Sequence, residues 1–424
     1  MRITLLNTNS HSGGAARACL RLTEALGRQA DVRADMLVAH QNAEHPQVTA
    51  YPQSWWQRKR LFGHFVGERL AYLPYERSKA GRFDLSLANT GFDVSSHPLV
   101  QRANVLHLHW VNQGFLSIRS LRRLAALGKP LVWTLHDMWP FTGGCHYSGD
   151  CRKYQTHCHT CPLVRRPHPR DISYRLWERK ATFYQQARLH VVTCSEWLGH
   201  QARQSPLLAD TEITSIPNGI DTALFAPGDT AAIRQRLGLP LDKRLLLFGA
   251  MKVSDERKGY RYLKEALAIH HQRYPEQADK VELVVFGKAD EAALATLPYP
   301  VHSLGLLSDQ ATIADAYRAV DAFVIPSLQD NLPNTVMESL ACGTPVIGFR
   351  TGGIPEMVAH KVAGYLVSQR DSTGLADGID YLLQDDDRYR TMATAARRKV
   401  EQDYSYDVVA RRYLKLYDRL LHST

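Results

Sequence analysis

Short apolar runs recur along the whole chain, and many of them end in turns rich in glycine, asparagine or aspartate. Apolar runs bounded in this way are typical of strands buried in a parallel sheet, and the longer amphipathic stretches between them are typical of helices. The pattern predicts strands at residues 2–7, 104–109, 131–135, 191–195, 244–248, 281–286, 301–306, 322–325 and 345–349. Because strands and helices alternate, the sequence predicts an α/β fold with a parallel sheet.

A strand, a polar turn and a helix follow one another twice between residues 321 and 367. Asn331 or Asn334 is expected to cap the first helix, and Gly352-Gly353 forms the turn before the second. Backbone N–H groups at such helix starts, together with the helix dipole, favour an anion at the carboxyl edge of the sheet. This stretch therefore predicts a phosphate-binding edge.

Two carboxylates flank the first of these helix starts. Asp330 and Glu338 stand eight positions apart, which is more than two helical turns, so they cannot both touch one atom of a ligand. A carboxylate accepts two hydrogen bonds from neighbouring hydroxyl groups, as ribose and hexose present them. The pair therefore predicts contacts with two parts of an extended ligand that carries sugar hydroxyls.

Length and composition narrow the class of protein. The 424 residues suffice for two domains, and a composition of 44% hydrophobic and 22% charged residues fits a globular enzyme. No apolar run reaches the ~18 residues of a membrane-spanning helix, and the N-terminus lacks the layout of a signal peptide, so the cytoplasm is the expected compartment. The net charge of +10 predicts an acidic partner, namely nucleic acid, an anionic lipid surface or a phosphorylated substrate.

A basic and aromatic segment covers residues 51–82. Its basic residues are Arg58, Lys59, Arg60, Arg69, Arg77, Lys79 and Arg82, and they are interleaved with Trp55, Trp56, Phe62, Phe65, Tyr72 and Tyr75. This mixture suits peripheral contact with a membrane, and it also suits single-stranded nucleic acid. The alternative is a solvated helix pair that packs on its domain by the aromatic face.

Four cysteines fall within the loop 143–163. Cys158 and Cys161 form a C-x-x-C pair, and Cys145 and Cys151 form a wider one. In a reducing compartment, four thiolates this close in sequence suit a structural tetrahedral Zn²⁺ site, and a redox pair or free thiols are the alternatives. Because four protein ligands leave no open position, such a metal would fold the loop and take no part in chemistry.

Further candidate contacts follow other predicted strands. His136 stands at the carboxyl end of strand 131–135, where α/β proteins place ligand contacts. The pair Gly13-Gly14 after the first strand lets the backbone approach a ligand closely. As alternatives, His136 is a structural histidine and the glycine pair is an ordinary turn.

The stretch 321–367 resembles the donor-nucleotide signature of family-4 retaining glycosyltransferases, which have the GT-B fold. The resemblance rests on Asp330 and Glu338, on Ala341-Cys342-Gly343-Thr344-Pro345-Val346-Ile347 and on Gly352-Gly353-Ile354-Pro355-Glu356. Asp330 departs from the family, which usually has glutamate there. The chain also resembles the bacterial exopolysaccharide branch of this family, of the colanic-acid type. This resemblance rests on His107-Leu108-His109-Trp110, His136-Asp137-Met138-Trp139 and Gly143-Gly144-Cys145-His146-Tyr147.

The resemblance implies a GT-B architecture, in which two doubly wound Rossmann-like domains face each other across a cleft. An acceptor-binding domain would cover residues 1–215 and would include the cysteine-rich loop 143–163. A nucleotide-sugar-binding domain would cover residues 216–405, beginning in a Pro/Gly turn, and the last helix, 406–424, would pack back on the first domain.

The resemblance also implies roles for individual residues. The expected catalytic set is His136, Asp330, Glu338 and Lys258. The expected donor-binding set is Gly13, Gly14, Lys252, Arg257, Lys258, Gly305, Asn331, Leu332, Asn334, Glu338, Gly352 and Gly353. Ala250 stands where the family has an arginine, so Lys252 or Arg257 would supply the second cation for the diphosphate.

The function implied is that of a retaining hexosyltransferase that needs no metal or other cofactor for its chemistry. It would use a UDP- or GDP-sugar and a glycan or polyprenyl-linked acceptor in bacterial polysaccharide assembly, at the inner face of the membrane. One alternative is a sugar-nucleotide 2-epimerase of the same fold. The other is a zinc-containing, basic nucleic-acid-binding protein, which the absence of a recognised nucleic-acid motif disfavours, so no nucleic-acid partner is expected.

Overall fold

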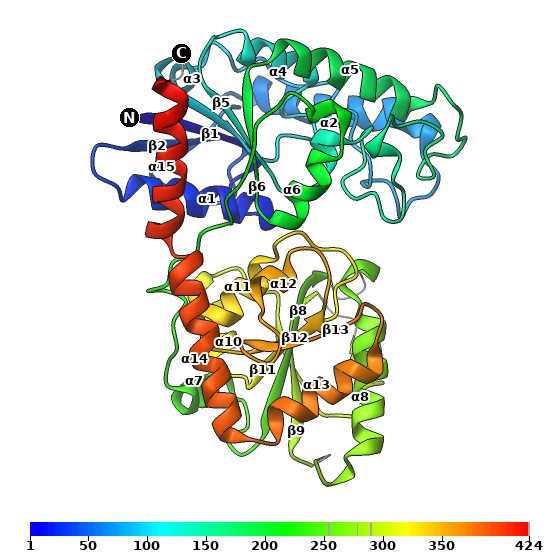
Figure 1. Ribbon diagram of the computed structural model, residues 1–424, viewed down its shortest axis with the longest axis vertical. Helices are drawn as coiled ribbons and strands as arrows, with labels where there is room; N and C mark the ends of the chain where they lie inside the picture. The colour runs from blue at the N-terminus through cyan, green and yellow to red at the C-terminus, as the bar shows by residue number, and fades with distance from the viewer. Residues whose placement is uncertain (253–254, 278, 289–290, 423–424) are drawn as a thin grey trace. The chain divides into compact units, whose positions relative to one another are not determined.

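The chain forms two compact units (Figure 1). Unit 1 comprises Met1–Gly219 and Val409–Thr424, and unit 2 comprises Ile220–Val408. The computed structural model describes residues 1–252, 255–277, 279–288 and 291–422, without the side chains of residues 250–252.

The sheet of unit 1 is parallel throughout, and its order in the described chain is β3-β2-β1-β4-β5-β6-β7. The strands are β1 (Arg2–Asn9), β2 (Arg33–His40), β3 (Val48–Ala50), β4 (Val105–Leu108), β5 (Leu131–Leu135), β6 (Leu189–Thr193) and β7 (Ile213–Ser215). Leu131–Leu135 is buried along its whole length because helices cover both faces of a parallel sheet. This explains why the strand reads as an unbroken apolar run.

The helices of unit 1 come from both ends of the chain. They are α1 (Gly14–Gly27), α2 (Trp55–Tyr72), α3 (Pro98–Arg102), α4 (Ile118–Ala125), α5 (Ile172–Gln186), α6 (Glu196–Arg203) and the last helix, α15 (Tyr406–His422). Tyr413 and Tyr417 of α15 hydrogen-bond to Thr134 and His107 of the sheet, at 2.9 and 2.7 Å. Residues more than 270 positions apart thus share one core.

Unit 2 contains the second parallel sheet, with the order β10-β9-β8-β11-β12-β13 in the described residues. Its strands are β8 (Arg244–Lys252), β9 (Val281–Lys288), β10 (Val301–Gly305), β11 (Ala322–Ile325), β12 (Val346–Phe349) and β13 (Gly364–Val367). The order reverses between β8 and β11, which is the topological switch point of a doubly wound sheet. The predicted doubly wound α/β class is therefore confirmed for both units.

Helices cover both faces of the unit 2 sheet. They are α7 (Thr230–Leu237), α8 (Tyr260–Arg273), α9 (Glu291–Leu294), α10 (Gln310–Arg318), α11 (Asn334–Ala341), α12 (Ile354–Met357), α13 (Ser372–Leu383) and α14 (Asp386–Asp403). Figure 1 shows α8 and α13 on one side of the sheet and α10 and α11 on the other. In the described part of both units, every helix is too short or too polar to cross a bilayer.

Candidate functional site

The switch point of unit 2 brings together two residues that the sequence predicts for ligand binding. Lys258 lies in a short 3₁₀ helix, Glu256–Lys258, after β8, and Asp330 lies in the loop after β11. The Lys258 Nζ is 2.7 Å from Asp330 Oδ2. Adjacent strands deliver these two loops to one carboxyl edge, where doubly wound sheets bind ligands.

Two glycines allow the loops of this edge to touch. Gly259 has φ +70°, and a Cβ there would lie 1.9 Å from the carbonyl oxygen of Pro326. Gly352 has φ +56°, and a Cβ there would lie 1.7 Å from the carbonyl oxygen of Asp330. Backbone atoms cannot rotate away from such a clash, so only glycine fits both positions. The backbone N–H of Gly353 then donates to the Asn331 carbonyl at 2.7 Å.

A second cation candidate, Arg257, pairs with a different carboxylate. Arg257 binds the carboxylate of Asp255 through its own backbone N–H and its guanidinium, at 2.8–3.2 Å. Burial favours the neutral acid at Asp255, but these bonds outweigh it and lower the pKa of its carboxyl group. The side chain of Lys252 lies outside the described residues. Lys258 is therefore the candidate cation that contacts Asp330.

Glu338 lies inside α11 and is buried. The phenol of Tyr317 donates to its Oε2 at 3.4 Å, a contact that the sequence does not predict because Tyr317 belongs to a different helix. Each carboxylate oxygen has two lone pairs, so Glu338 can accept further hydrogen bonds beside that from Tyr317.

The prediction that Asn331 or Asn334 caps α11 is wrong. Pro333 occupies the cap position with no side-chain cap bond, and Asn334 is already the first helical residue. The φ of Pro333, −67°, suits the residue before a helix. Helix α11 therefore begins one position earlier than it would with Asn334 as its cap. Asn331 and Leu332 are both buried beside this turn.

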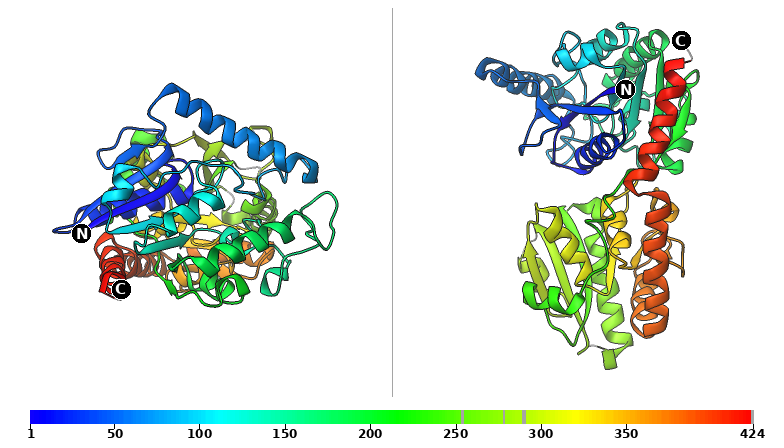
Figure 2. Two further views of the ribbon diagram at one scale, coloured as in Figure 1. Left: turned by 90° about the horizontal axis from the view of Figure 1, so that it is seen from above. Right: turned by 90° about the vertical axis from the view of Figure 1, so that its left-hand side faces the viewer.

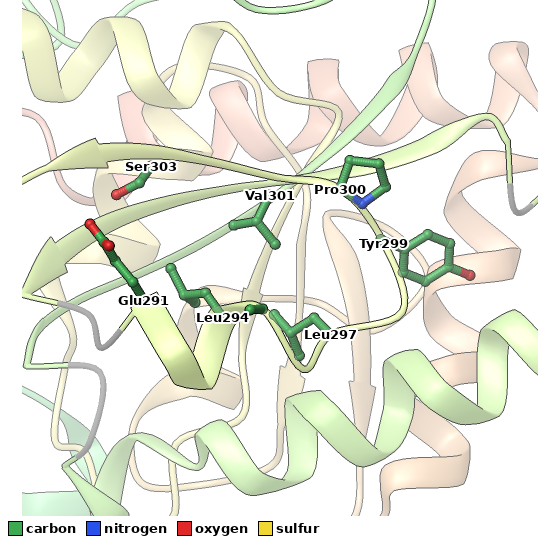
Figure 3. Close-up of a pocket in the computed structure, with 8 residues that line it drawn as sticks. Glu291, Leu294, Leu297, Tyr299, Pro300, Val301 and Ser303 are labelled. Carbon is green, nitrogen blue, oxygen red and sulfur yellow. The ribbon is translucent and has the colours of Figure 1, made fainter.

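Gly305 ends the edge strand β10 with φ +64°, and no atom lies within 4 Å of a Cβ built there. A shallow depression of about 430 Å³ lies nearby, between α9 and β10 (Figure 3). Its lining includes Glu291, Leu294, Tyr299 and Ser303 but none of the predicted donor residues. The depression is therefore separate from the edge where Lys258 and Asp330 meet.

In unit 1, the glycine pair opens the first helix. Gly13 has φ +93° at the cap position of α1, and Gly14 is its first residue. No described atom lies within 4 Å of a Cβ built on Gly13, so the positive φ rather than crowding favours glycine at this position.

His136 is held at both ring nitrogens. His109 Nδ1 lies 2.9 Å from its Nε2, the two rings stack, and the Cys194 Sγ lies 3.4 Å from its Nδ1. Burial disfavours the imidazolium and lowers the pKa of His136 to about 4, so the ring is neutral at pH 7. His109 and Cys194 therefore hold the His136 ring in a fixed orientation.

His107 of β4 extends this buried group. His107 binds Thr134 Oγ1 and the Tyr417 hydroxyl, both at 2.7 Å, and burial lowers its pKa to about 3. The signal in the sequence is the alternation in strand 104–109, which places His107 and His109 on one face. The pairing of His109 with His136 was not predicted, because it depends on two strands lying in register.

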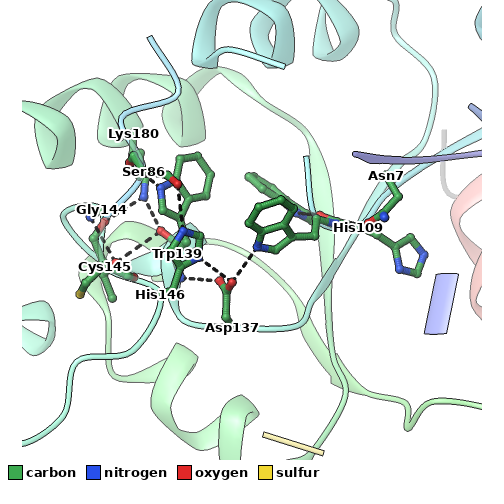
Figure 4. Close-up of polar contacts among 12 residues, drawn as sticks. Asn7, Ser86, His109, Asp137, Trp139, Gly144, Cys145, His146 and Lys180 are labelled. Atoms are coloured by element: carbon green, nitrogen blue, oxygen red, sulfur yellow. Dashed lines mark hydrogen bonds and ion pairs between the residues drawn. The ribbon is translucent and has the colours of Figure 1, made fainter. Parts of the chain in front are cut away.

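Asp137 binds residues of the following loop (Figure 4). Its carboxylate accepts from Trp110 Nε1 at 2.9 Å, from His146 Nδ1 at 2.7 Å and from the Trp139 backbone at 2.9 Å. Burial alone would raise its pKa, but the charge of His146 and these hydrogen bonds outweigh burial and lower the pKa of Asp137. Asp137 is thus a structural centre rather than a ligand contact.

The cysteine-rich loop holds four free thiols. Each of them acts electrostatically on at least one of the others, and the Gly143 N–H donates to Cys158 Sγ at 3.1 Å. Burial raises the pKa of Cys145 and Cys158 to about 12 and that of Cys161 to about 11. Within the described ranges, no three side chains of histidine, cysteine, aspartate or glutamate are placed to hold a metal ion. The thiols are neighbours, but they do not form a ready tetrahedron.

Two family models match the chain. Residues 12–224 match the model described as "Glycosyltransferase Family 4", and residues 242–385 match "Glycosyl transferases group 1". The first match covers half of the chain and corresponds to most of unit 1, and the second corresponds to most of unit 2.

Among curated proteins, the chain is 31% identical to a D-inositol 3-phosphate glycosyltransferase of Thermobispora bispora over 49% of the chain and 51% of that protein. It thus spans about half the length of this relative. It is 27% identical, over 79% of the chain and 77% of the relative, to the Escherichia coli protein named "Putative colanic acid biosynthesis glycosyl transferase WcaC".

Two solved structures share the fold at low identity. Sucrose-phosphate synthase from Thermosynechococcus elongatus superposes with a TM-score of 0.68 at 21% identity over 100% of both chains. Anabaena HepE, solved in complex with UDP and glucose, superposes with a TM-score of 0.64 at 19% identity over 99% of both chains. These likenesses concern the fold, which is that of GT-B proteins.

Proposed function

The chain belongs to glycosyltransferase family 4, and from this we propose that it is a retaining hexosyltransferase of bacterial polysaccharide assembly. It moves a hexose from a nucleotide-diphosphate sugar to a glycan or polyprenyl-linked acceptor. The contact between Lys258 and Asp330 at the unit 2 switch point carries this proposal, because it places a cation and a hydrogen-bond acceptor at the edge where such a donor binds.

Each residue at this edge has a chemical role in the proposal. Lys258 neutralises the donor diphosphate, Asp330 accepts from hydroxyl groups of the hexose, and Glu338 accepts from the ribose hydroxyls. Backbone N–H groups of residues 331–334 and 352–353 add donors, with Arg257 or Lys252 as second cation. In this proposal Gly305 lies beside the base, Gly13-Gly14 face the diphosphate or the acceptor, and His136 contacts the sugar.

The proposed chemistry needs no protein nucleophile. The glycosidic bond to the diphosphate breaks, and the departing phosphate oxygen takes the proton of the acceptor hydroxyl, which attacks the same face of the sugar. The leaving diphosphate gains negative charge in the transition state, and fixed cations and N–H groups stabilise that charge without reorganisation. Activity is therefore expected in EDTA, and a strict need for added Mg²⁺ or Mn²⁺ contradicts the role of Lys258.

The epimerase and the nucleic-acid alternatives gain no support from the two family models, which both describe glycosyltransferases. Incubation of a UDP-sugar without acceptor tests the first, because only an epimerase produces a new UDP-sugar under these conditions. We propose that the enzyme works in the cytoplasm, where nucleotide sugars are made available to it. The HepE complex makes UDP the first nucleotide to test, with GDP as the alternative.

We also propose that Cys145, Cys151, Cys158 and Cys161 bind a structural Zn²⁺. Their spacing and their mutual proximity support this, although the metal would have to draw the thiolates together. Elemental analysis of protein purified in reducing buffer is expected to find one zinc per chain, and Cys158→Ser is expected to lose it. Protein free of zinc contradicts the proposal.

The donor site is tested by nucleotide-induced stabilisation. A ligand present at about 100 times its dissociation constant raises the unfolding free energy by about 2.7 kcal/mol, so UDP, GDP and their sugars can be ranked by thermal shift. Glu338→Gln is expected to weaken the stabilising nucleotide at least about tenfold, because the amide loses the charge that accepts from two ribose hydroxyls. Glu282→Gln, in β9 and paired with His302, is the matched control. Equal shifts in wild type and Glu338→Gln contradict the assignment.

A further inference from the structure

Helix α2 has apolar residues on two different sides. Leu61 and Tyr72 are buried in the core of unit 1. Trp56 and Phe62, on the other side, are 72% and 65% exposed. The left-hand view of Figure 2 shows this helix, in medium blue, along the outer margin of unit 1.

The exposed apolar side chains form a stripe. With 3.6 residues per turn, positions 55, 59, 62, 66, 70 and 73 recur on one side of the helix and its following turn. The buried positions 61, 68 and 72 recur on another side. In the described residues, six of the nine exposed large hydrophobic side chains lie between Trp55 and Phe83, so the apolar surface is concentrated here rather than scattered.

Positive charge surrounds this stripe. Segment 51–82 contains seven basic and two acidic residues, a net charge of +5, which is half of the +10 of the whole chain. Arg58, Lys59 and Arg60 are exposed, and the Lys59 ammonium lies 5.3 Å from the centre of the Trp55 ring. The stripe is therefore both apolar and cationic.

The two acidic residues of the segment are bound by other groups of unit 1. Glu68 is buried and accepts from the backbone N–H groups of Leu87 and Ala88, at 2.8 and 3.3 Å. Glu76 forms an ion pair with Arg82 at 3.1 Å. The outward side of α2 thus presents cations with no exposed carboxylate among them.

We propose that this surface, Trp55, Trp56, Phe62, Leu70 and Leu73 with Arg58, Lys59 and Arg60, docks on an anionic lipid bilayer. Indole rings favour the level of the lipid headgroups, and the negative surface potential of an anionic leaflet attracts Lys and Arg. Arg58, Lys59 and Arg60 stand among the aromatic rings, and the net charge of +5 in segment 51–82 is complementary to an anionic lipid surface. The proposal concerns lipid binding alone, so its test is independent of the proposed transfer reaction.

Flotation of the full-length protein with vesicles tests the proposal. Wild type is expected to float with phosphatidylcholine vesicles that contain phosphatidylglycerol, and to remain behind with phosphatidylcholine alone. Trp55→Ser/Trp56→Ser/Phe62→Ser and Arg58→Gln/Lys59→Gln/Arg60→Gln are each expected to lower the affinity for anionic vesicles at least about tenfold. High salt is expected to weaken wild-type binding, because it screens the cations.

Matched controls come from unit 2. Leu241→Ser/Val362→Ser removes exposed apolar side chains, and Arg390→Gln/Arg398→Gln removes exposed charges, so both are expected to bind vesicles like wild type. Thermal unfolding checks that each variant folds, and Trp56→Ser alone serves if the triple variant does not.

Three outcomes overturn the proposal. One is a wild type that does not float with anionic vesicles, or that floats equally with neutral ones. Another is a set of α2 variants that bind like wild type. The third is self-association of the chain that the α2 variants abolish, without vesicle binding, which would show that the surface serves a second copy.

Discussion

The contact between Lys258 and Asp330 joins the residue proposed for the diphosphate to the residue proposed for the hexose. In the free protein each charge neutralises the other across 2.7 Å. A bound donor would replace this contact by two new ones, phosphate on the cation and hydroxyl groups on the carboxylate. The pair thus keeps both side chains placed at the edge before the donor arrives.

Variants of Lys258 and of Asp330 are expected to affect nucleotide binding and sugar transfer differently. Lys258→Met is expected to lower kcat/KM about 10²-fold, because the leaving diphosphate loses its cation. Asp330→Asn is expected to bind UDP or GDP at least as tightly as wild type, since Lys258 is released, while transfer of the sugar falls. Steady-state kinetics and calorimetric titration of the nucleotide measure these effects.

Lys264→Met is the matched control, because this exposed lysine of α8 donates to Thr296 at 2.9 Å and has no role in the proposed donor site. Its kinetics should equal those of wild type. If Lys258→Met also retained wild-type kcat/KM, or if Asp330→Asn bound nucleotide diphosphate more weakly, the proposed roles would be wrong.

At the site, the sequence could identify Asp330 and Glu338 as candidates from their positions beside a predicted helix start, and Lys258 from the resemblance to the family. It could not place Tyr317 beside Glu338 or His109 beside His136, since these contacts depend on elements that are distant in sequence. The asparagine cap failed for a local reason, the preference of Pro333 for the position before the helix.

The turn that contains Gly352 connects β12 to α12, and it packs against the loop of Asp330, which follows β11. Its positive φ and its approach to the Asp330 carbonyl both require glycine. Gly352→Ala is expected to destabilise unit 2 by about 1–3 kcal/mol and to weaken nucleotide binding, because the loop with Asp330 must shift. Thermal unfolding and nucleotide titration measure the two effects.

Gly238→Ala provides the control for backbone strain alone. Gly238 has φ +67° but no atom within 4 Å of a built Cβ. It ends α7, away from the described contacts of Lys258 and Asp330, so this variant is expected to lose some stability and no nucleotide affinity. If both alanine variants bound nucleotide alike, the contact between the two loops would not matter for the ligand.

Apolar runs predicted the central strands well, because central parallel strands are buried on both faces; β11 is Ala322–Ile325 as expected. The strands β3 and β7, of three residues each, were not predicted because they are too short to show a period. Strand β2 was also missed, since Arg33 and Asp35 interrupt its apolar run.

Three buried histidines make the stability of unit 1 depend on pH. Burial lowers the pKa of His107 to about 3 and of His136 to about 4, and it lowers the pKa of His109 well below its ordinary value of 6.5. Between pH 6.5 and about 4 the unfolded chain binds protons that the folded chain does not, so the unfolding free energy falls as pH falls. The loss is expected to be on the order of a few kcal/mol.

Thermal unfolding between pH 7.5 and 5 measures this dependence. His107→Asn is expected to flatten it, because one buried imidazole no longer takes up a proton on unfolding. A midpoint that stays constant down to pH 5 in wild type would contradict the neutral state of these rings.

The last helix has a consequence for how the chain assembles during translation. Unit 1 needs the hydroxyl groups of Tyr413 and Tyr417, which emerge from the ribosome only after the whole of Ile220–Val408. Unit 2, although synthesised second, is therefore the first to have its complete sequence outside the exit tunnel. Until α15 is synthesised, the sheet of unit 1 lacks one of the helices that cover it. The apolar surface exposed in this way makes the nascent chain prone to aggregation, which chaperones counteract.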